Sequence, residues 1–286
     1  MTQLTVPAYA KLNLTLDVLG KRPDGFHDLK MVMQSVSLHD DVTLTLGGGT
    51  GIAPAADWGF LPTDGRNIAV KAAEVFARAT GTDLNGLTIR LEKRIPVCAG
   101  TAGGSSDGAA VLRGLNQLCG AGLSPEALAK LGEQVGSDVP YCVLGGTMLA
   151  QGRGEVLTRL APMPDCAIVM CKPGFPVSTP ELYNRLDTMK IRCRPNTDGL
   201  IAALEAGDLA AVARQMYNVF EDALPVHRAN VIREIRNTLI QRGALGACLS
   251  GTGPTVFGVF QTQSEARAAA AALRETFRET FVVHPI

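Results

Sequence analysis

The sequence lacks the features that mark nucleic-acid binding, export and membrane insertion. Acidic and basic residues are equal in number, 27 of each, so no net charge attracts the chain to nucleic acid or to an anionic membrane. No segment approaches the roughly 18 consecutive apolar residues of a membrane span, and the first residues lack a basic stretch followed by an apolar run. We therefore expect a cytoplasmic protein that binds neither nucleic acid nor membrane.

Residues that bind metals or form disulfides are also few. The 7 cysteines form no C-x-x-C pair and are odd in number, which indicates reduced thiols. The 4 histidines lie too far apart in the sequence to form a zinc ligand set at the usual spacing. The sequence therefore predicts no metal held by protein side chains and leaves phosphate groups as the expected carriers of any metal ion.

The length and composition are those of a globular protein with more than one domain. The chain has 286 residues, which at about 150 residues per domain predicts two domains. With 46% hydrophobic and 19% charged residues, each domain can bury a core of its own. Glycines near residues 152–154 suggest the boundary, so we divide the chain into residues 1–153 and 154–286.

The first residues of the chain have strand patterns. Residues 11–18 alternate between polar and apolar side chains, which predicts a half-buried strand. Its polar face, with Lys11, Asn13 and Thr15, is expected to point to solvent, as it does in most alternating strands. The turn sequence "RPDGFH" follows, and residues 31–46 are typical of further strands, so the chain opens as an antiparallel sheet.

Helices and strands alternate along the rest of the chain. Helical periodicity covers residues 67–79, with Gly81 as its stop, and Ser124-Pro125-Glu126 starts a helix that ends near Gly136. The remaining expected elements are a strand at 87–92, a hairpin at 146–160, strands at 167–171, 246–250, 255–260 and 280–283, and helices near 180–187, 197–217, 229–242 and 264–277. This interleaving predicts an α+β domain whose sheet is covered by helices.

The stretch "CAGTAGGSSDGAA", residues 98–110, joins a strand to a helix with an apolar stripe. Its glycines and the first turn of the helix, capped by Ser105 or Ser106, would expose backbone N–H groups to an anion such as phosphate. No lysine follows the glycines as in a P-loop, and their spacing and late position do not fit a dinucleotide-binding loop. The stretch is therefore either a phosphate site or a flexible connection.

Three further sites each allow a functional and a purely structural interpretation. A second glycine-rich turn at residues 250–253 is by itself typical of a hairpin, although it could close over one ligand together with residues 98–110. Asp138 follows a helix end and is expected to cap the short helix after it. The aromatic pair Phe26 and His27, like Tyr183, would either stack on a base or cover the sheet.

Taken together, these segments resemble the GHMP kinase superfamily. The resemblance covers nearly the whole chain and rests on stretches that follow in the superfamily's order and approximate spacing. They are "AYAKLNLTLDVLGKRPDGFHDL", "NIAVKAA", "KRIPVCAGTAGGSSDGAAVLRGLN", "GSDVPYCVLGGTMLAQGRGEVL", "KPGFPVSTPELY" and "LSGTGPTVFGVF". The resemblance implies an α+β fold of two domains with an active site in the cleft between them. The N-terminal domain would be ribosomal-protein-S5-domain-2-like with a left-handed βαβ crossover, and the C-terminal domain ferredoxin-like.

The resemblance also implies a phosphotransferase activity. Members with these motifs transfer the γ-phosphoryl group of ATP, with Mg²⁺, to the tertiary 2-hydroxyl of cytidine-diphosphate-linked methylerythritol in the non-mevalonate pathway of isoprenoid biosynthesis. Carried over, Lys11 and Asp138 are the catalytic pair. Asp138 would accept the hydroxyl proton, and Lys11 would orient Asp138 and stabilise charge on the acceptor oxygen and the phosphoryl group. Such a small set of polar groups fits a reaction that depends mainly on positioning and electrostatics.

The same resemblance implies residues that bind the substrate. Asn13 and His27 would hold it, with Phe26 and Tyr183 on either side of the cytosine ring and Thr179 nearby. The turn that carries Phe26, together with Tyr183, favours a cytidine substrate over those of homoserine- or mevalonate-type GHMP kinases. A catalytically silent nucleotide-binding regulator is a second alternative, but it would not need the pair Lys11 and Asp138. We expect a monomer or a weak homodimer.

For ATP, the resemblance places Asn67 and Lys93 near the adenosine. The residues that would wrap the phosphates are Pro96, Val97, Cys98, Ala99, Gly100, Thr101, Ala102, Gly103, Gly104, Ser105 and Ser106. The superfamily members commonly have a longer glycine run here, and in this chain Cys98, Ala99 and Ala102 replace glycines while Thr101 replaces a leucine. Because each added Cβ restricts positive φ angles, we expect this part of the loop to differ in shape from its relatives.

Overall fold

The computed structural model describes residues 2–47, 52–56 and 67–286, which form two compact units. Unit 1 comprises Met1–Ala10, Leu38–Val97 and Ala102–Gly145, and unit 2 comprises Lys11–Ser37, Cys98–Thr101 and Gly146–Ile286. The units alternate along the chain because two long strands run through both. The expected domain boundary after residue 153 stays a prediction.

These two strands are β1 (Thr2–Lys21) and β2 (His27–Leu46), which are neighbours in one sheet. β2 is a single strand where the sequence suggested several, because no glycine or proline interrupts it. The predicted turn between the strands is confirmed: the Arg22 N–H donates to the Phe26 carbonyl at 2.8 Å, and Gly25 has a φ of 84°.

The polar face of β1 is buried, so the expectation of a solvated face was wrong. Lys11 is 5% exposed, and Asn13 and Thr15 are 0% exposed. Each side chain has a hydrogen-bond partner: the Lys11 Nζ donates to the Asn13 Oδ1 at 2.6 Å, and the Thr15 Oγ1 accepts from the Val32 N–H at 3.1 Å. Buried polar groups persist where such bonds replace those to water, so this face belongs to the interior of the protein rather than to its surface.

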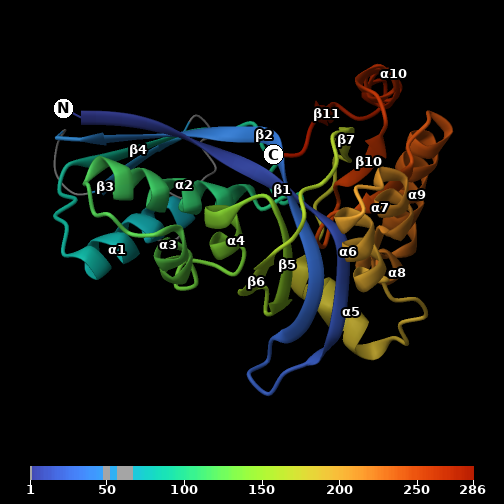
Figure 1. Cartoon of the computed structure of the whole chain (residues 1–286), viewed down its shortest axis with the longest axis horizontal. Helices are drawn as coiled ribbons and strands as arrows, with labels where there is room; N and C mark the ends of the chain where they lie inside the picture. Colours follow the sequence, from blue (N-terminus) through green and yellow to red (C-terminus); the bar gives the residue numbers. More distant parts are fainter. Residues whose placement is uncertain (1, 48–51, 57–66) are drawn as a thin grey trace. The chain divides into compact units, whose positions relative to one another are not determined.

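In unit 1, β4 (Leu87–Glu92) pairs antiparallel with the second half of β2 and parallel with β3 (Ile52–Ala56). The helices of this unit are α1 (Ile68–Thr80), α2 (Gly103–Leu118), α3 (Pro125–Gly132) and α4 (Val139–Leu144), and they lie on one side of the strands (Figure 1). The segment β3–α1–β4 forms a parallel βαβ unit, whose left hand stays a prediction.

The predicted starts of α1 and α3 are confirmed, whereas the predicted end of α3 was wrong. The Asn67 side chain accepts from the Ala69 N–H at the start of α1, and Gly81 ends that helix with a φ of 71°. Ser124 caps α3 in the same way. α3 stops at Gly132 rather than near Gly136, because the following residues tighten into turns in which the Val135 N–H donates to the Gly132 carbonyl.

In unit 2, the strands β7 (Ala167–Lys172), β9 (Gly246–Leu249), β10 (Val256–Phe260) and β11 (Glu279–Val283) form an antiparallel sheet. Their order is β11-β7-β10-β9. Counted along the chain, the last strand lies beside the first and the third beside the second, which is the ferredoxin-like arrangement that the sequence predicted. β5 (Thr147–Gly152) and β6 (Val156–Arg159) form the expected hairpin, and β5 pairs with β2.

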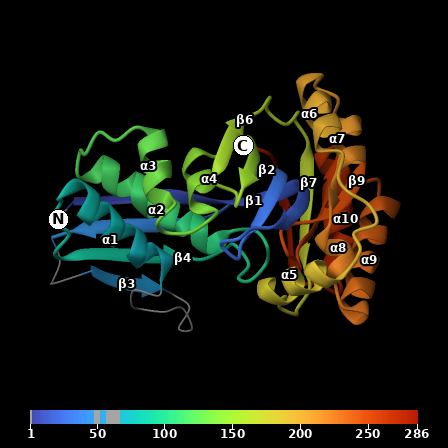
Figure 2. The same ribbon diagram turned by 90° about the horizontal axis from the view of Figure 1, so that it is seen from below.

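The helices of unit 2 are α5 (Thr179–Thr188), α6 (Thr197–Glu205), α7 (Leu209–Gln215), α8 (Phe220–Ala223), α9 (Val226–Gln241) and α10 (Gln263–Arg274). α9 and α10 pack against the antiparallel sheet, and α6 and α7 lie side by side (Figure 2). The sequence predicted one helix over 197–217, but Gly207 and the capping residue Asp208 divide it. The short strand β8 (Tyr217–Asn218), which pairs with β1, was not predicted. Among the described residues, no helix combines the length and apolar character that crossing a bilayer requires.

Candidate active site

The predicted phosphate-binding helix α2 begins earlier than expected, at Gly103. Ala102 occupies the N-cap position, so the prediction that Ser105 or Ser106 caps the helix was wrong. The Ser106 hydroxyl instead donates to the Tyr9 carbonyl of β1 at 2.5 Å. No side chain caps α2, so its first N–H groups stay available to an anion, which the helix dipole also attracts.

The loop before α2 keeps a left-handed backbone at positions that carry side chains. Cys98 has a φ of 52° and Ala102 a φ of 58°, and Gly100 between them has a φ of 75°. Cys98 and Ala102 are two of the positions at which the resemblance to the superfamily led us to expect glycine. A Cβ in this region costs about 1–2 kcal/mol, so these residues tolerate strain to hold the loop's shape.

We expect Ala102→Gly to raise the free energy of unfolding by about 0.5–1 kcal/mol. Glycine removes the strain of the positive φ, and its greater freedom in the unfolded chain offsets only part of that gain. Urea unfolding would measure the change. The matched control is Ala268→Gly, on an exposed face inside α10, which introduces glycine at an ordinary helical position. Its free energy of unfolding should fall by about 0.5–1 kcal/mol. If the free energy of unfolding changed in the same direction in both variants, the backbone at Ala102 would not be strained.

The loop segment 98–101 and the turn 250–253 meet within unit 2. The Ser250 hydroxyl donates to the Gly100 carbonyl at 2.9 Å, and the Thr255 N–H donates to the Ala99 carbonyl at 3.3 Å. The turn is itself fixed by the buried amide of Asn218, which donates to the carbonyls of Leu249 and Gly251. The two glycine-rich turns therefore form one structure, which the sequence could not show.

The predicted residues Lys11 and Asn13 belong to the same group of contacts. The Asn13 N–H donates to the Ser250 Oγ at 3.3 Å, and the Lys11 N–H donates to the Thr101 carbonyl at 3.1 Å. The Asn13 side chain also approaches the Met31 sulfur at 3.3 Å. A buried lysine side chain is unusual outside functional sites, because desolvation of a charge is costly.

The predicted aromatic residues gather on a second part of unit 2. The rings of His27 and Tyr183 stack with their centroids 4.5 Å apart, and Tyr183 meets Phe220 edge to face at 4.9 Å. Phe26 is 52% exposed, with the Arg153 guanidinium 5.1 Å above its ring. Thr179, at the start of α5, shares a hydrogen bond of 2.8 Å with Thr252, so α5 is tied to the glycine-rich turn.

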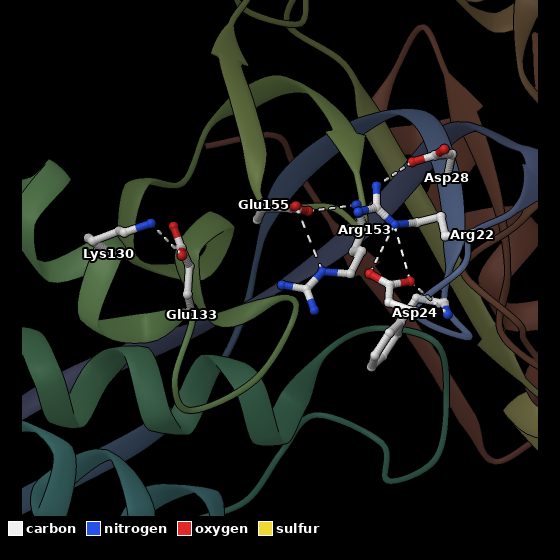
Figure 3. A network of polar contacts seen from close by, with 8 residues as sticks. Arg22, Asp24, Asp28, Lys130, Glu133, Arg153 and Glu155 are labelled. Carbon is white, nitrogen blue, oxygen red and sulfur yellow. Dashed lines mark hydrogen bonds and ion pairs between the residues drawn. The ribbon is translucent and has the colours of Figure 1, made fainter.

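Ion pairs hold the turn that carries Phe26 and His27. Figure 3 shows Arg22 between two carboxylates, with the Asp28 Oδ1 at 2.7 Å and the Asp24 Oδ2 at 3.2 Å. Asp24 also accepts the Phe26 N–H at 3.1 Å. Exposed pairs of this kind contribute little to stability, but here they fix the direction in which the turn presents an exposed ring.

In unit 1, Asp138 stands at the N-cap position of α4, as predicted, but its carboxylate accepts no capping hydrogen bond from that helix. The expected role as a cap was therefore wrong. Asn67 does cap α1, through its Oδ1. The position of Asp138 at the start of α4 thus agrees with the prediction, and its role there does not.

Lys93 is fully engaged inside unit 1, between the carboxylates of Asp40 and Asp107. The exposed fractions of the three side chains are 3%, 0% and 6%. Asp40 also accepts the Ile95 N–H at 2.7 Å. This group of three charged side chains was not predicted from the sequence, although Asp107 is visible there as a carboxylate within the apolar stretch of α2. Within the described ranges, no three His, Cys, Asp or Glu side chains gather where they could hold a metal ion.

Two buried carboxylates with one ammonium leave an excess negative charge, so one carboxyl binds a proton readily. Burial raises the pKa of Asp107 to about 7, although Lys93 opposes the shift. The unfolded value is about 3.9, so between about pH 4 and 7 the folded chain holds one more proton. Stability conferred by this group is full below about pH 4 and is lost as the pH rises through 7, by at most about 1.4 kcal/mol per pH unit. Urea unfolding should show this slope in the wild type and not in Asp107→Asn, and parallel curves for the two proteins would contradict it.

Two family models match this chain. The model for the GHMP kinases N terminal domain covers residues 67–146, and the model for GHMP kinases C terminal covers residues 200–279. The first includes α1, α2 and Asp138, and the second includes β9, β10 and the turn 250–253. The glycine-rich loop, Asp138 and the turn 250–253 therefore lie in segments that these models describe, whereas Lys11, Asn13 and the predicted aromatic residues lie outside them.

Relatives match the chain over nearly its full length. A protein of Alkaliphilus metalliredigens (strain QYMF), named 4-diphosphocytidyl-2-C-methyl-D-erythritol kinase, is 42% identical over 99% of this chain and 97% of its own. A crystal structure of 4-(cytidine 5'-diphospho)-2C-methyl-D-erythritol kinase superimposes with a TM-score of 0.83 at 32% identity, covering 99% of both chains. A homoserine kinase from Cytophaga hutchinsonii shares the fold, with a TM-score of 0.78 at 21% identity over 100% of this chain and 95% of its own. The two-domain fold that the sequence predicted is thereby confirmed, and the chain belongs to the 4-diphosphocytidyl-2-C-methyl-D-erythritol kinase family of the GHMP kinases.

Proposed function

We propose that this protein is an ATP-dependent kinase that phosphorylates the 2-hydroxyl of 4-diphosphocytidyl-2-C-methyl-D-erythritol, a step of the non-mevalonate pathway to isopentenyl diphosphate. Family membership supports the reaction and the substrate. The observation that carries the proposal is the buried Lys11, held by Asn13 and joined through its backbone to Thr101 of the glycine-rich loop. A protein that only binds a nucleotide has no need to bury an ammonium group there.

In this proposal Asp138 accepts the proton of the acceptor hydroxyl, and Lys11 stabilises the negative charge that develops on that oxygen and on the transferring phosphoryl group. Asn13 holds Lys11 through a hydrogen bond of 2.6 Å and thereby fixes where the ammonium points. Because phosphoryl transfer involves little covalent chemistry by the protein, accurate placement of these groups provides most of the acceleration.

The ATP phosphates fit the start of α2. Its first turn is not capped by a side chain, and Gly103 and Gly104 let a ligand approach the backbone closely. Mg²⁺ would enter with the phosphates and neutralise part of their charge. Asn67 and Lys93 are proposed to lie near the adenosine, although Lys93 is occupied by Asp40 and Asp107, so any effect of Lys93 on the nucleotide acts through the neighbouring backbone.

The proposed substrate contacts come from unit 2. Phe26 and Tyr183 would hold the cytosine ring between them, with His27 and Thr179 beside it. Phe26 supports this role because it is a large aromatic side chain left half exposed on a turn that ion pairs hold in place. The cytoplasmic location and a monomeric or weakly dimeric state remain predictions from the sequence.

The test is turnover of ATP with purified 4-diphosphocytidyl-2-C-methyl-D-erythritol. We expect one ADP and one new phosphomonoester per substrate, the latter visible as a new ³¹P resonance. Homoserine and mevalonate should not be phosphorylated, and cytidine diphosphate should protect the turn 22–28 from proteolysis. If no turnover were seen at high enzyme concentration, the proposed kinase activity would be refuted. Turnover of homoserine or mevalonate instead would favour another GHMP kinase that shares only the fold.

A further inference from the structure

His27 makes a second contact with α5, besides its stack on Tyr183. Its Nε2 lies 2.7 Å from the Oδ1 of Asp187, and the other oxygen of Asp187 accepts the Lys21 Nζ at 3.0 Å. Tyr183 and Asp187 are four residues apart in α5 and therefore lie on the same face of that helix. One face of α5 thus contacts the imidazole twice, through the stacked ring of Tyr183 and through the carboxylate of Asp187.

Asp187 is ionised in this arrangement. Its hydrogen bond from His27, and then the one from Lys21, lower the pKa of the Asp187 carboxyl below its ordinary value. An ionised carboxylate can only accept hydrogen bonds. The Nε2 that faces it must therefore carry a proton, and in the neutral imidazole the Nδ1 is then the acceptor.

The pair also borders a pocket that Phe26 and Tyr183, the residues proposed to hold the cytosine ring, do not line. His27 and Asp187 contribute to the wall of a pocket of about 630 Å³ in unit 2, together with residues at the end of β1 and after α5. The His27 side chain is 9% exposed and that of Asp187 25% exposed. The imidazole is thus largely enclosed, so the groups around it can fix its orientation and its tautomer.

We infer that Asp187 is a positioning residue that sets the base specificity of the proposed kinase by fixing the tautomer of His27. This inference rests on the proposed function, because it takes the cytosine ring to lie at His27. An acceptor at Nδ1 matches the 4-amino group of cytosine, which donates hydrogen bonds, and opposes the 4-carbonyl of uracil, which only accepts them. A site that leaves such a carbonyl facing an acceptor rejects uracil because both groups stay unpaired.

The decisive variant is Asp187→Asn. Lys21 can only donate, so it takes the amide oxygen and turns the amide nitrogen toward His27. The Nε2 then accepts, the proton moves to Nδ1, and the edge that faces the base becomes a donor. We expect the ratio of the dissociation constants for uridine and cytidine diphosphate to fall about tenfold, the value of one ordinary hydrogen bond. The kcat with the cytidine-linked substrate should stay within about twofold of the wild-type value, because the reacting hydroxyl is not involved. The weaker contact with the base should instead raise KM.

Calorimetric titration with cytidine and uridine diphosphate gives the ratio, and ¹⁵N chemical shifts of His27 report which ring nitrogen is protonated. The control is Asp198→Asn, which also removes a carboxylate from a lysine, the exposed pair with Lys30, and should leave both measurements unchanged. Asp187→Ala tests for a merely structural role. If Asp187 only held the local structure, this variant would lower the affinities for both nucleotides equally.

Three results would overturn the inference: an unchanged ratio in Asp187→Asn, equal weakening of both nucleotides, or a His27 proton on Nδ1 in the wild type. The binding ratio does not depend on turnover. An inactive wild type that still prefers cytidine diphosphate would therefore refute the proposed kinase reaction and leave the role of Asp187 standing.

Discussion

Asp138→Asn is expected to lower kcat by about 10²- to 10⁴-fold, because an amide cannot accept the proton of the acceptor hydroxyl. The change should leave the fold intact. The amide has nearly the shape of the carboxylate, and α4 begins without a capping hydrogen bond from Asp138. Steady-state kinetics would give kcat, and calorimetry would give the affinity for ATP, which we expect to change little.

The control for this variant is Glu133→Gln. It also replaces a carboxylate of unit 1 by an amide, in a pair with Lys130 in which the lysine is exposed (Figure 3). Such a pair contributes at most a few tenths of a kcal/mol, so activity and stability should stay near those of the wild type. Normal turnover by Asp138→Asn would show that another group takes the proton. A loss of ATP binding equal to the loss of kcat would show that Asp138 acts on binding.

Gly100→Ala is expected to lower the free energy of unfolding by about 3 kcal/mol, with two separate causes. The first is the left-handed backbone, since the φ of Gly100 is +75°. The second is space: a Cβ would lie 2.1 Å from the Ser250 carbonyl oxygen and 3.1 Å from the Gly253 nitrogen. Both neighbours are backbone atoms, so the loop and the turn 250–253 would have to separate.

Gly81→Ala distinguishes the two causes. Gly81 has nearly the same φ, +71°, but a Cβ there meets nothing within 4 Å. The free energy of unfolding of Gly81→Ala should therefore fall only by the cost of the left-handed backbone, about 1–2 kcal/mol. Urea unfolding of both variants gives the difference, which measures the close approach of the two turns. Equal losses in the two variants would mean that Gly100 is needed only for its backbone angle.

The elements that the sequence predicted best are those with local signals. Helical periodicity predicted the helix that begins after Asn67, and the start at Ser124 forms as expected, because each depends on residues within one turn of the helix. The cap predicted at Ser106 failed for the opposite reason. Its hydroxyl bonds to Tyr9, 97 residues away in the sequence, and nothing in the local pattern shows such a partner.

The candidate site likewise has features with a signal in the sequence and features that depend on distant partners. Motif order was enough to choose Lys11, Asp138 and the glycine-rich loop. The burial of the polar face of β1 could not be predicted, because an alternating pattern looks the same whether the polar side meets water or buried partners. Contacts such as that between Ser250 and Gly100, 150 residues apart, leave no periodic trace. The partner of His27 was hidden similarly, since Asp187 looks like an ordinary helix-surface residue.

The passage of β1 and β2 through both units has a consequence for how the protein is made. The Ser37 N–H donates to the His284 carbonyl, Val36 forms a bridge with Pro285, and the Gln34 side chain donates to the Ile286 carbonyl across 252 residues. During synthesis, residues 34–37 leave the ribosome early and must wait for 284–286 before these bonds can form. This part of unit 2 therefore completes its folding only after residues 284–286 have been made, and until then other contacts or chaperones must keep the early strands from aggregating.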